Sequence, residues 1–330
     1  MGPAPAALVT GVGLSLPGHA DAARLVDPRG SRIVAEAPSA DPLAGRGLRY
    51  KDRATRLGLA ATGAALRHAG LLGERGVSLP GRRVGVVVSS NLGNLDTVCR
   101  VVETIAEETV GGTSPMDLPN ASSNVIASSI AIRFALGGVN LTLCNGATSG
   151  LDALHWAVLL LAAGRVEAAV VCGVETANPV VERLVDGGRV GDGARPSRLL
   201  DGAVAVVVEP PAPVARPAAV GLATLGGYAR RATLAESVRH ALGPGSGEVG
   251  IWFVAEDHAD DGPWSAGLDG VPTSDLSQSL GACSGALGVL QCWAAVAWLG
   301  STTDGTALLT AGGSGDDASA AMVVSGGEGA

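Results

Sequence analysis

The chain is poor in aromatic side chains, in charged side chains and in long apolar runs. Aromatic residues make up 3% and charged residues 16% of its 330 residues. Its 23 Lys and Arg against 31 Asp and Glu give a net charge of −8, so we expect no basic stripe that could bind a nucleic-acid backbone. The beginning of the chain lacks the basic and long apolar regions of a signal peptide, and every apolar run is shorter than a membrane span. We therefore expect a cytoplasmic protein with no membrane or nucleic-acid partner.

Paired metal ligands and disulfide motifs are also missing. The sequence has five cysteines, none of them in a C-x-x-C pair and none with a histidine at zinc-ligand spacing. These are Cys99, Cys144, Cys172, Cys283 and Cys292. This pattern predicts neither a disulfide framework nor a structural metal, and it fits a reducing compartment.

Apolar and small residues are abundant. Hydrophobic residues make up 47% of the chain, and 49 residues are glycine, which suits packed α/β layers whose backbones approach closely. Apolar periodicity and turn residues predict strands over residues 7–12, 83–89, 139–144, 167–174 and 203–209, with helices over residues 52–70, 91–108, 120–136 and 149–164. Gly13 is expected to close the first strand, and Gly70 to end the first helix.

The second part of the chain repeats this order in shorter form. Strands are expected over residues 219–228, 250–255, 307–311 and 320–324, with helices over residues 234–242 and 285–300. We therefore predict two similar halves, residues 1–210 and residues 217–330. The prolines that mark the join are Pro210, Pro211, Pro213 and Pro217.

Several segments, in this order, resemble the β-ketoacyl synthases of the thiolase fold. They are YKDR at residues 50–53, LGLAA at 57–61, RVGVVVSS at 83–90, IAIRFALGGVNLT at 130–142, ATSG at 147–150 and LGA at 280–282. The resemblance covers nearly the whole chain, although the second half is shorter than in typical members. It implies an α/β fold with two duplicated halves in an α-β-α-β-α layered arrangement.

The positions that the resemblance assigns to chemistry carry other residues in this chain. The family uses a Cys nucleophile on a strand-to-helix turn, two His residues and a Lys. In this sequence Ala147 stands at the nucleophile, Glu256 at the first His, Gln278 at the second His and Thr273 at the Lys. His258 lies two positions past the first of these His positions. A methyl group cannot carry an acyl chain, so we expect no acyl condensation by this chain alone.

This pattern resembles the chain-length factor, the non-catalytic partner of a type II polyketide ketosynthase. The resemblance implies a heterodimer with a catalytic ketosynthase, formed through the strand at residues 139–144, in which each subunit lines the other's acyl tunnel. Acyl chains would arrive on the phosphopantetheine of an acyl carrier protein that docks mainly on the partner, and this chain would bind no cofactor. Candidates for the tunnel and interface are Met116, Leu118, Asn120, Ala121, Ser122, Ser123, Leu141 and Leu143. Most side chains in the stretch 114–126 are small, which favours a long, narrow tunnel and a polyene-type product.

Two other functions stay open at this stage. The chain could be a partner-independent acyltransferase or hydrolase that uses Cys144 or Ser149. Alternatively, it could be a homodimeric scaffold or binding protein without acyl chemistry. A free cysteine on an apolar strand is usually a small buried side chain, which is the simpler interpretation of Cys144.

Overall fold

The computed structural model describes residues 6–17, 47–187, 198–211, 219–243, 247–256, 268–302 and 305–326. The first half contains β1 (Ala7–Ser15), α1 (Arg53–His68), β2 (Leu72–Gly73), β3 (Gly76–Val77), β4 (Val84–Ser89), α2 (Leu95–Glu108), α3 (Asp117–Asn120), α4 (Val125–Phe134), β5 (Asn140–Leu143), α5 (Ser149–Ala162), β6 (Ala168–Glu175), α6 (Pro179–Gly187) and β7 (Gly202–Glu209). The second half contains β8 (Ala223–Arg231), α7 (Leu234–Leu242), β9 (Val249–Phe253), β10 (Thr273–Ser274), α8 (Ser277–Leu280), α9 (Leu287–Leu299), β11 (Thr306–Ala311) and β12 (Ser319–Gly326).

Ten of these strands form one sheet, in the order β10-β9-β11-β12-β8-β1-β7-β6-β4-β5. If the five strands of each half are numbered along the chain, both halves have the spatial order third, second, fourth, fifth, first. The third, second and fourth strands run parallel, and the fifth is antiparallel to both of its neighbours in each half. The duplicated fold expected from the sequence is therefore confirmed.

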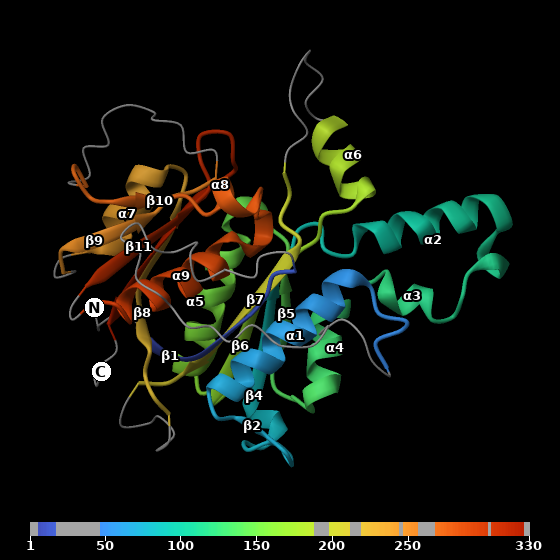
Figure 1. Cartoon of the computed structure of the whole chain (residues 1–330), viewed down its shortest axis with the longest axis horizontal. Coiled ribbons are helices and arrows are strands. Elements are labelled where there is room, and N and C mark those ends of the chain that lie inside the picture. Colours follow the sequence, from blue (N-terminus) through green and yellow to red (C-terminus); the bar gives the residue numbers. More distant parts are fainter. Residues whose placement is uncertain are drawn as a thin grey trace.

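Three clusters of buried apolar side chains lie between the layers of helices and strands. Leu57 of α1 and Ile130 of α4 cover one face of the first-half strands. Leu154 of α5 and Trp293 of α9 belong to a central cluster that contacts strands of both halves. Val238 of α7 covers the outer face of the second-half strands. The layers are therefore α1 and α4, the first-half strands, α5 and α9, the second-half strands, and α7, as Figure 1 shows.

The two central helices cross with their backbones in contact. A Cβ atom on Gly150 of α5 would lie 2.6 Å from the Gly288 nitrogen, and one on Gly288 of α9 would lie 2.3 Å from the Leu151 nitrogen. Only glycine fits at this crossing, because any side chain would overlap the opposing backbone. The residues of α9 are buried on all sides apart from Trp298, as expected for a helix in the middle of a layered fold.

The first strand is longer than the sequence predicted. Gly13, expected to end it, lies inside β1, which runs on to Ser15. A Cβ atom on Gly13 would lie 2.3 Å from the Ala61 oxygen of α1, so this glycine allows the helix backbone to approach the strand. Gly70 has φ +65° just after α1, in agreement with its expected role at the helix end.

The segment between β4 and β5 differs most from the prediction. Four residues precede α2 where a helix was expected, and the helix predicted over residues 120–136 is interrupted between α3 and α4. The side-chain amide of Asn94 donates to the carbonyls of Asn120 and Ser122, each at 3.0 Å, so these carbonyls are held outside a continuous helix. Figure 1 shows α2 and α3 projecting from the body of the molecule.

The predicted join lies only partly within the described residues. Pro213 and Pro217 of the predicted join lie outside the described residues. No helix in the described ranges is both long enough and apolar enough to cross a bilayer.

Candidate functional site

The turn between β5 and α5 carries Ala147, at the position where the resemblance expects a nucleophile. A 3-10 turn, Gly146–Thr148, leads directly into α5. The positive end of the α5 dipole would stabilise a thiolate here, but the half-buried Ala147 side chain is a methyl group. Ala147 therefore lies at the N-terminal end of a helix, as a nucleophile of this family would, but its side chain cannot form a bond to an acyl group.

Ser149, a possible alternative nucleophile, is fully buried. Its hydroxyl oxygen accepts a hydrogen bond from the Asn145 backbone N–H at 2.9 Å. The same oxygen lies 2.8 Å from the Gly146 carbonyl and 3.0 Å from Asn91 Oδ1, so the hydroxyl proton is held by one of these acceptors. The side chain stabilises the turn and is enclosed within it.

Cys144, the other alternative, is exposed, so the expectation of a small buried side chain is wrong. It follows the last residue of β5, and its Sγ lies 3.7 Å from the Asn91 carbonyl. Partial burial of the thiol and the nearby charge of Glu175 raise the pKa of Cys144. A raised pKa reduces the thiolate fraction, which is the opposite of what an activated nucleophile needs.

A polar network fastens the Ala147 turn to the second half of the chain. The Asp152 carboxylate of α5 accepts hydrogen bonds from Asn145, from Thr148 Oγ1 at 2.9 Å and from the Tyr228 hydroxyl of β8. Arg230, also on β8, donates to Thr148 Oγ1 at 3.2 Å. The turn is therefore fixed from both halves.

Glu256, at the first His position, binds the loop that leads into α9. Its Oε1 accepts the backbone N–H groups of Cys283 and Ser284, the latter at 3.0 Å. Asn91 Nδ2 donates to Ser284 Oγ at 2.9 Å and to the Gly146 carbonyl at 3.0 Å. Ser284 and Asn91 thus connect Glu256 to the turn that carries Ala147. The Glu256 carboxylate therefore holds two backbone N–H groups at the position where the resemblance expects an imidazole.

Glu175, the last residue of β6, belongs to the site although no sequence motif indicates it. Its carboxylate accepts hydrogen bonds from the backbone N–H groups of Asn91 at 2.6 Å, Leu92 at 3.0 Å and Gly285 at 3.1 Å, and Ser90 Oγ lies 3.4 Å away. Burial raises the pKa of Glu175 to about 7, although these hydrogen bonds act in the opposite direction. The one sequence signal was an acidic residue at the end of an otherwise apolar strand.

Glu175 and Glu256 both line a cavity of ≈ 200 Å³. Its other polar side chains are Thr176 and Ser284, and the remaining lining residues are apolar, Leu92 among them. Both carboxyl groups accept backbone N–H groups, so they hold the loops around the cavity in place.

The remaining family positions lie at the surface. Thr273 pairs with Trp252 where β10 meets β9, and its side chain is exposed. Gln278 is exposed on α8. Neither makes a recorded side-chain hydrogen bond to the Ala147 turn in the described part of the chain. His258 lies outside the described residues.

The candidate tunnel residues lie on the projecting α2–α3 segment and on β5. Met116 is 54% and Leu118 47% exposed, although both are large and apolar. Ser122 and Ser123 are exposed and Ala121 is half-buried. Such apolar exposure on a projecting segment is typical of a surface that another chain covers.

Three other candidates contact residues of this chain. Asn120 is buried, and its side-chain amide donates to the carbonyls of Tyr50 at 2.6 Å and Met116 at 2.9 Å, so it fixes the segment in place. On β5, Leu141 and Leu143 are half-buried against the central cluster.

Comparison with known proteins agrees with this geometry. Residues 33–185 match the family described as "Beta-ketoacyl synthase, N-terminal domain". The chain is 31% identical over 96 residues to the 3-oxoacyl-[acyl-carrier-protein] synthase 2 of Vibrio harveyi, and 29% identical over 131 residues to that of Vibrio cholerae. These matches cover 29% and 39% of this chain, and only 23% and 31% of those two relatives.

Solved structures are similar over nearly the whole chain. One, described as "The ishigamide ketosynthase/chain length factor", has a TM-score of 0.71 at 22% identity and covers 96% of this chain and 98% of its own. A type II PKS acyl-carrier protein in complex with its ketosynthase has a TM-score of 0.77 at 16% identity, over 98% and 100% of the two chains. A β-ketoacyl synthase from Burkholderia phymatum STM815 has a TM-score of 0.74 at 14% identity, with the same coverage.

The chain therefore has the thiolase-like fold of the solved ketosynthases, and residues 33–185 are similar to the β-ketoacyl synthase N-terminal domain. The solved structures that share this fold include those described as a ketosynthase/chain length factor and as a type II PKS ketosynthase with its acyl-carrier protein.

Proposed function

We propose that this chain is the non-catalytic chain-length factor of a heterodimeric type II polyketide ketosynthase. It stabilises the catalytic ketosynthase and completes its acyl tunnel while a chain bound to an acyl carrier protein is elongated with malonyl units. The proposal rests on a ketosynthase fold whose β5–α5 turn carries Ala147, the position that the resemblance aligns with the nucleophile. Ser149 is enclosed and Cys144 has a raised pKa, so neither residue replaces the missing thiol.

The surface around β5 supports a partner subunit. Within the described residues β5 is the outermost strand of its sheet and pairs only with β4. Large apolar side chains are exposed on the neighbouring α5, where Trp156 is 47% and Leu159 36% exposed. An open strand edge beside exposed apolar side chains favours association with another chain.

Small side chains on the projecting segment support the proposal that the acyl tunnel is long and narrow. Ala121, Ser122 and Ser123 leave space that a bulkier residue would fill. We propose that this space accommodates an extended polyene-type chain. The acyl group stays on the phosphopantetheine of the carrier protein, which docks mainly on the ketosynthase, in the cytoplasm of a bacterium that makes secondary metabolites.

The test is the native mass and activity of this chain co-expressed with the ketosynthase encoded nearest to it. We expect a one-to-one complex that elongates carrier-bound acyl chains, whereas this chain alone accepts no acyl group. Ala147→Ser, matched in size, should leave activity of the complex unchanged.

Two outcomes would reverse the proposal in different ways. A homodimer that becomes acylated without a partner would identify an independent acyltransferase or hydrolase, and Cys144→Ser and Ser149→Ala would show which residue carries the acyl group. A homodimer that neither becomes acylated nor binds the ketosynthase would identify a scaffold protein.

A further inference from the structure

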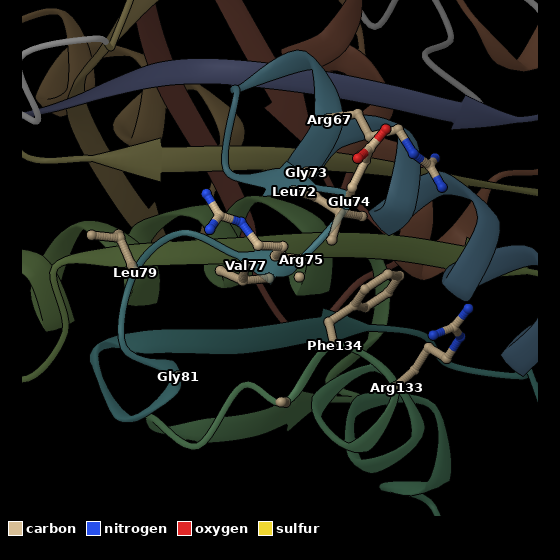
Figure 2. Close-up of a pocket in the computed structure, with 12 residues that line it drawn as sticks. Arg67, Leu72, Gly73, Glu74, Arg75, Val77, Leu79, Gly81, Arg133 and Phe134 are labelled. Carbon is tan, nitrogen blue, oxygen red and sulfur yellow. The ribbon is translucent and has the colours of Figure 1, made fainter.

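A groove of ≈ 730 Å³ lies between the β2–β3 hairpin and the last turns of α1 and α4 (Figure 2). Gly81, which lines it, precedes β4, whereas the candidate site lies beyond the opposite ends of β4 and β6. The groove and the site of Ala147 are therefore at opposite ends of the parallel strands, and a ligand of the groove would not be a substrate of that site.

Three exposed arginines line the groove. Arg67 comes from α1, Arg75 from the hairpin and Arg133 from α4 (Figure 2). None of their guanidinium groups has a hydrogen bond or an ion pair among the residues that the structure describes. Glu74 is the one acidic side chain in the lining. The groove thus concentrates positive charge in a chain whose net charge is −8.

Two of these guanidinium groups lie close to one aromatic ring. Arg133 Cζ is 5.8 Å from the centre of the Phe134 ring. A Cβ atom placed on Gly63 would lie 3.4 Å both from Arg67 Nη1 and from Phe134 Cζ, so Arg67 and Phe134 both lie beside Gly63. Arg67 and Arg133 both bring a positive charge to this groove, so an anion that contacts their guanidinium groups would be favoured.

The helix dipoles explain only part of this arrangement. Arg67 and Arg133 lie in the last turns of α1 and α4, where a cation is favoured. Arg75, however, lies on a hairpin and has no helix end to stabilise. The final carbonyls are also already used, since the Leu71 N–H donates to Leu66 O at 2.9 Å and the Leu136 N–H to Ala131 O at 2.8 Å.

We propose that this groove binds a nucleotide, with a phosphate between Arg67 and Arg133 and its ring against Phe134 and the apolar side chains of the hairpin. Guanidinium groups match phosphate oxygens with paired hydrogen bonds, and aromatic rings stack on planar bases. The volume of the groove is in the range of small-molecule sites, and Leu72 and Val77 provide an apolar wall. The net charge of the whole chain gives no sign of this site, because the acidic residues elsewhere outnumber its three arginines.

The test is calorimetric titration of the purified full-length protein with ADP, adenosine and inorganic phosphate. We expect saturable binding of one ADP, weakened by added salt, and at least tenfold weaker binding of adenosine and of phosphate alone. Arg67→Gln and Arg133→Gln should each weaken ADP binding about tenfold, because each removes a charge-assisted hydrogen bond. Arg82→Gln is the matched control, since Arg82 is exposed beside the groove but does not line it.

Arg75→Gln gives a second, independent variant in an exposed turn, and circular dichroism of each variant checks that it is folded. The proposal is overturned if ADP does not bind saturably, or if adenosine binds as tightly as ADP. An equal loss of ADP affinity in Arg82→Gln and Arg67→Gln would also overturn it, because it would indicate nonspecific electrostatic attraction of ADP to the surface. Binding of an oligoglutamate peptide without binding of ADP would instead identify a docking surface for an acidic protein.

Discussion

Glu175 is a buried carboxylate that organises the candidate site. Together with Glu256 it holds the backbone N–H groups of three consecutive residues, Cys283, Ser284 and Gly285. The pKa of Glu175 is raised to about 7 by burial, so above that pH the folded chain must keep a charge away from water. Its ionisation therefore opposes folding over an identifiable range of pH.

The change Glu175→Gln should remove this pH dependence. An unfolded Glu titrates near its usual pKa of 4.5, so the stability linked to the proton is complete below that pH and is lost as pH rises toward 7. The unfolding free energy of the native chain, relative to Glu175→Gln, should fall by about 2 to 3 kcal/mol between pH 5 and pH 8. Urea denaturation at several pH values measures this difference.

The control is Glu103→Gln, which changes an exposed residue of α2. It should leave the pH dependence of unfolding as it is in the native chain. A parallel pH profile for Glu175→Gln and the native chain would show that Glu175 is not the group that titrates.

At the scale of helices and strands, the local pattern of apolar residues predicts most of the elements. The apolar runs of β4, β6 and β7 and the helix α7 (Leu234–Leu242) lie close to where the sequence predicts them. The helix α6 was missed, although its start has a local signal: Asn178 Oδ1 accepts the N–H groups of Val180 at 3.0 Å and Val181 at 3.1 Å, and Pro179 occupies the first helical position. The break between α3 and α4 depends on Asn94, more than twenty residues earlier, and no local pattern contains it.

The candidate site was predictable only in part, for the same reason. Motif matching finds the Ala147 turn, because the motif is contiguous. It does not find the contact of Asn91 with Ser284, since these residues are 193 positions apart and meet only in the folded sheet. The exposure of Cys144 likewise depends on β5 being the outermost strand, which apolar character alone does not reveal.

The crossing of α5 and α9 gives a prediction about packing. Gly288→Ala should destabilise the chain by more than about 2 kcal/mol or prevent folding, because the new methyl group would overlap the backbone of Leu151. Gly187→Ala, at the open end of α6, is the control and should change stability by less than about 0.5 kcal/mol. Thermal unfolding compares the two variants. Similar melting temperatures would mean that the central helices can separate without cost.

The open edge of β5 gives a prediction about assembly. The Val86 N–H donates to Val139 O and the Ser90 N–H to Leu143 O, so alternate residues point to β4 and the Thr142 N–H points to the open side. Thr142→Pro should keep the chain folded, because proline is tolerated on an edge strand, but should abolish the complex with the ketosynthase. Light scattering after gel filtration measures this, with Thr142→Val as the control. A Thr142→Pro complex of unchanged mass would place the interface elsewhere.

At the scale of the whole molecule, the proposed function assigns the projecting segment to the wall of the acyl tunnel. If Ser123 faces the tunnel of the complex, Ser123→Phe should fill it and shorten the products by at least one two-carbon unit. Ser301→Phe, at an exposed position in the second half, should leave the products as they are. Mass spectrometry of the released products distinguishes the two variants. An unchanged distribution in Ser123→Phe would exclude this segment from the tunnel wall.

The position of β1 in the sheet has a consequence for how the protein is made. β1 pairs with β7 and β8, and Leu8 lies opposite Glu209, so the first strand has no partner until about 200 further residues have been added. At translation rates of about 5 to 20 residues per second, the apolar first strand waits roughly 10 to 40 s beside the ribosome. The newborn chain is most vulnerable to aggregation during this interval, and chaperone supply during translation should limit its yield in a foreign host.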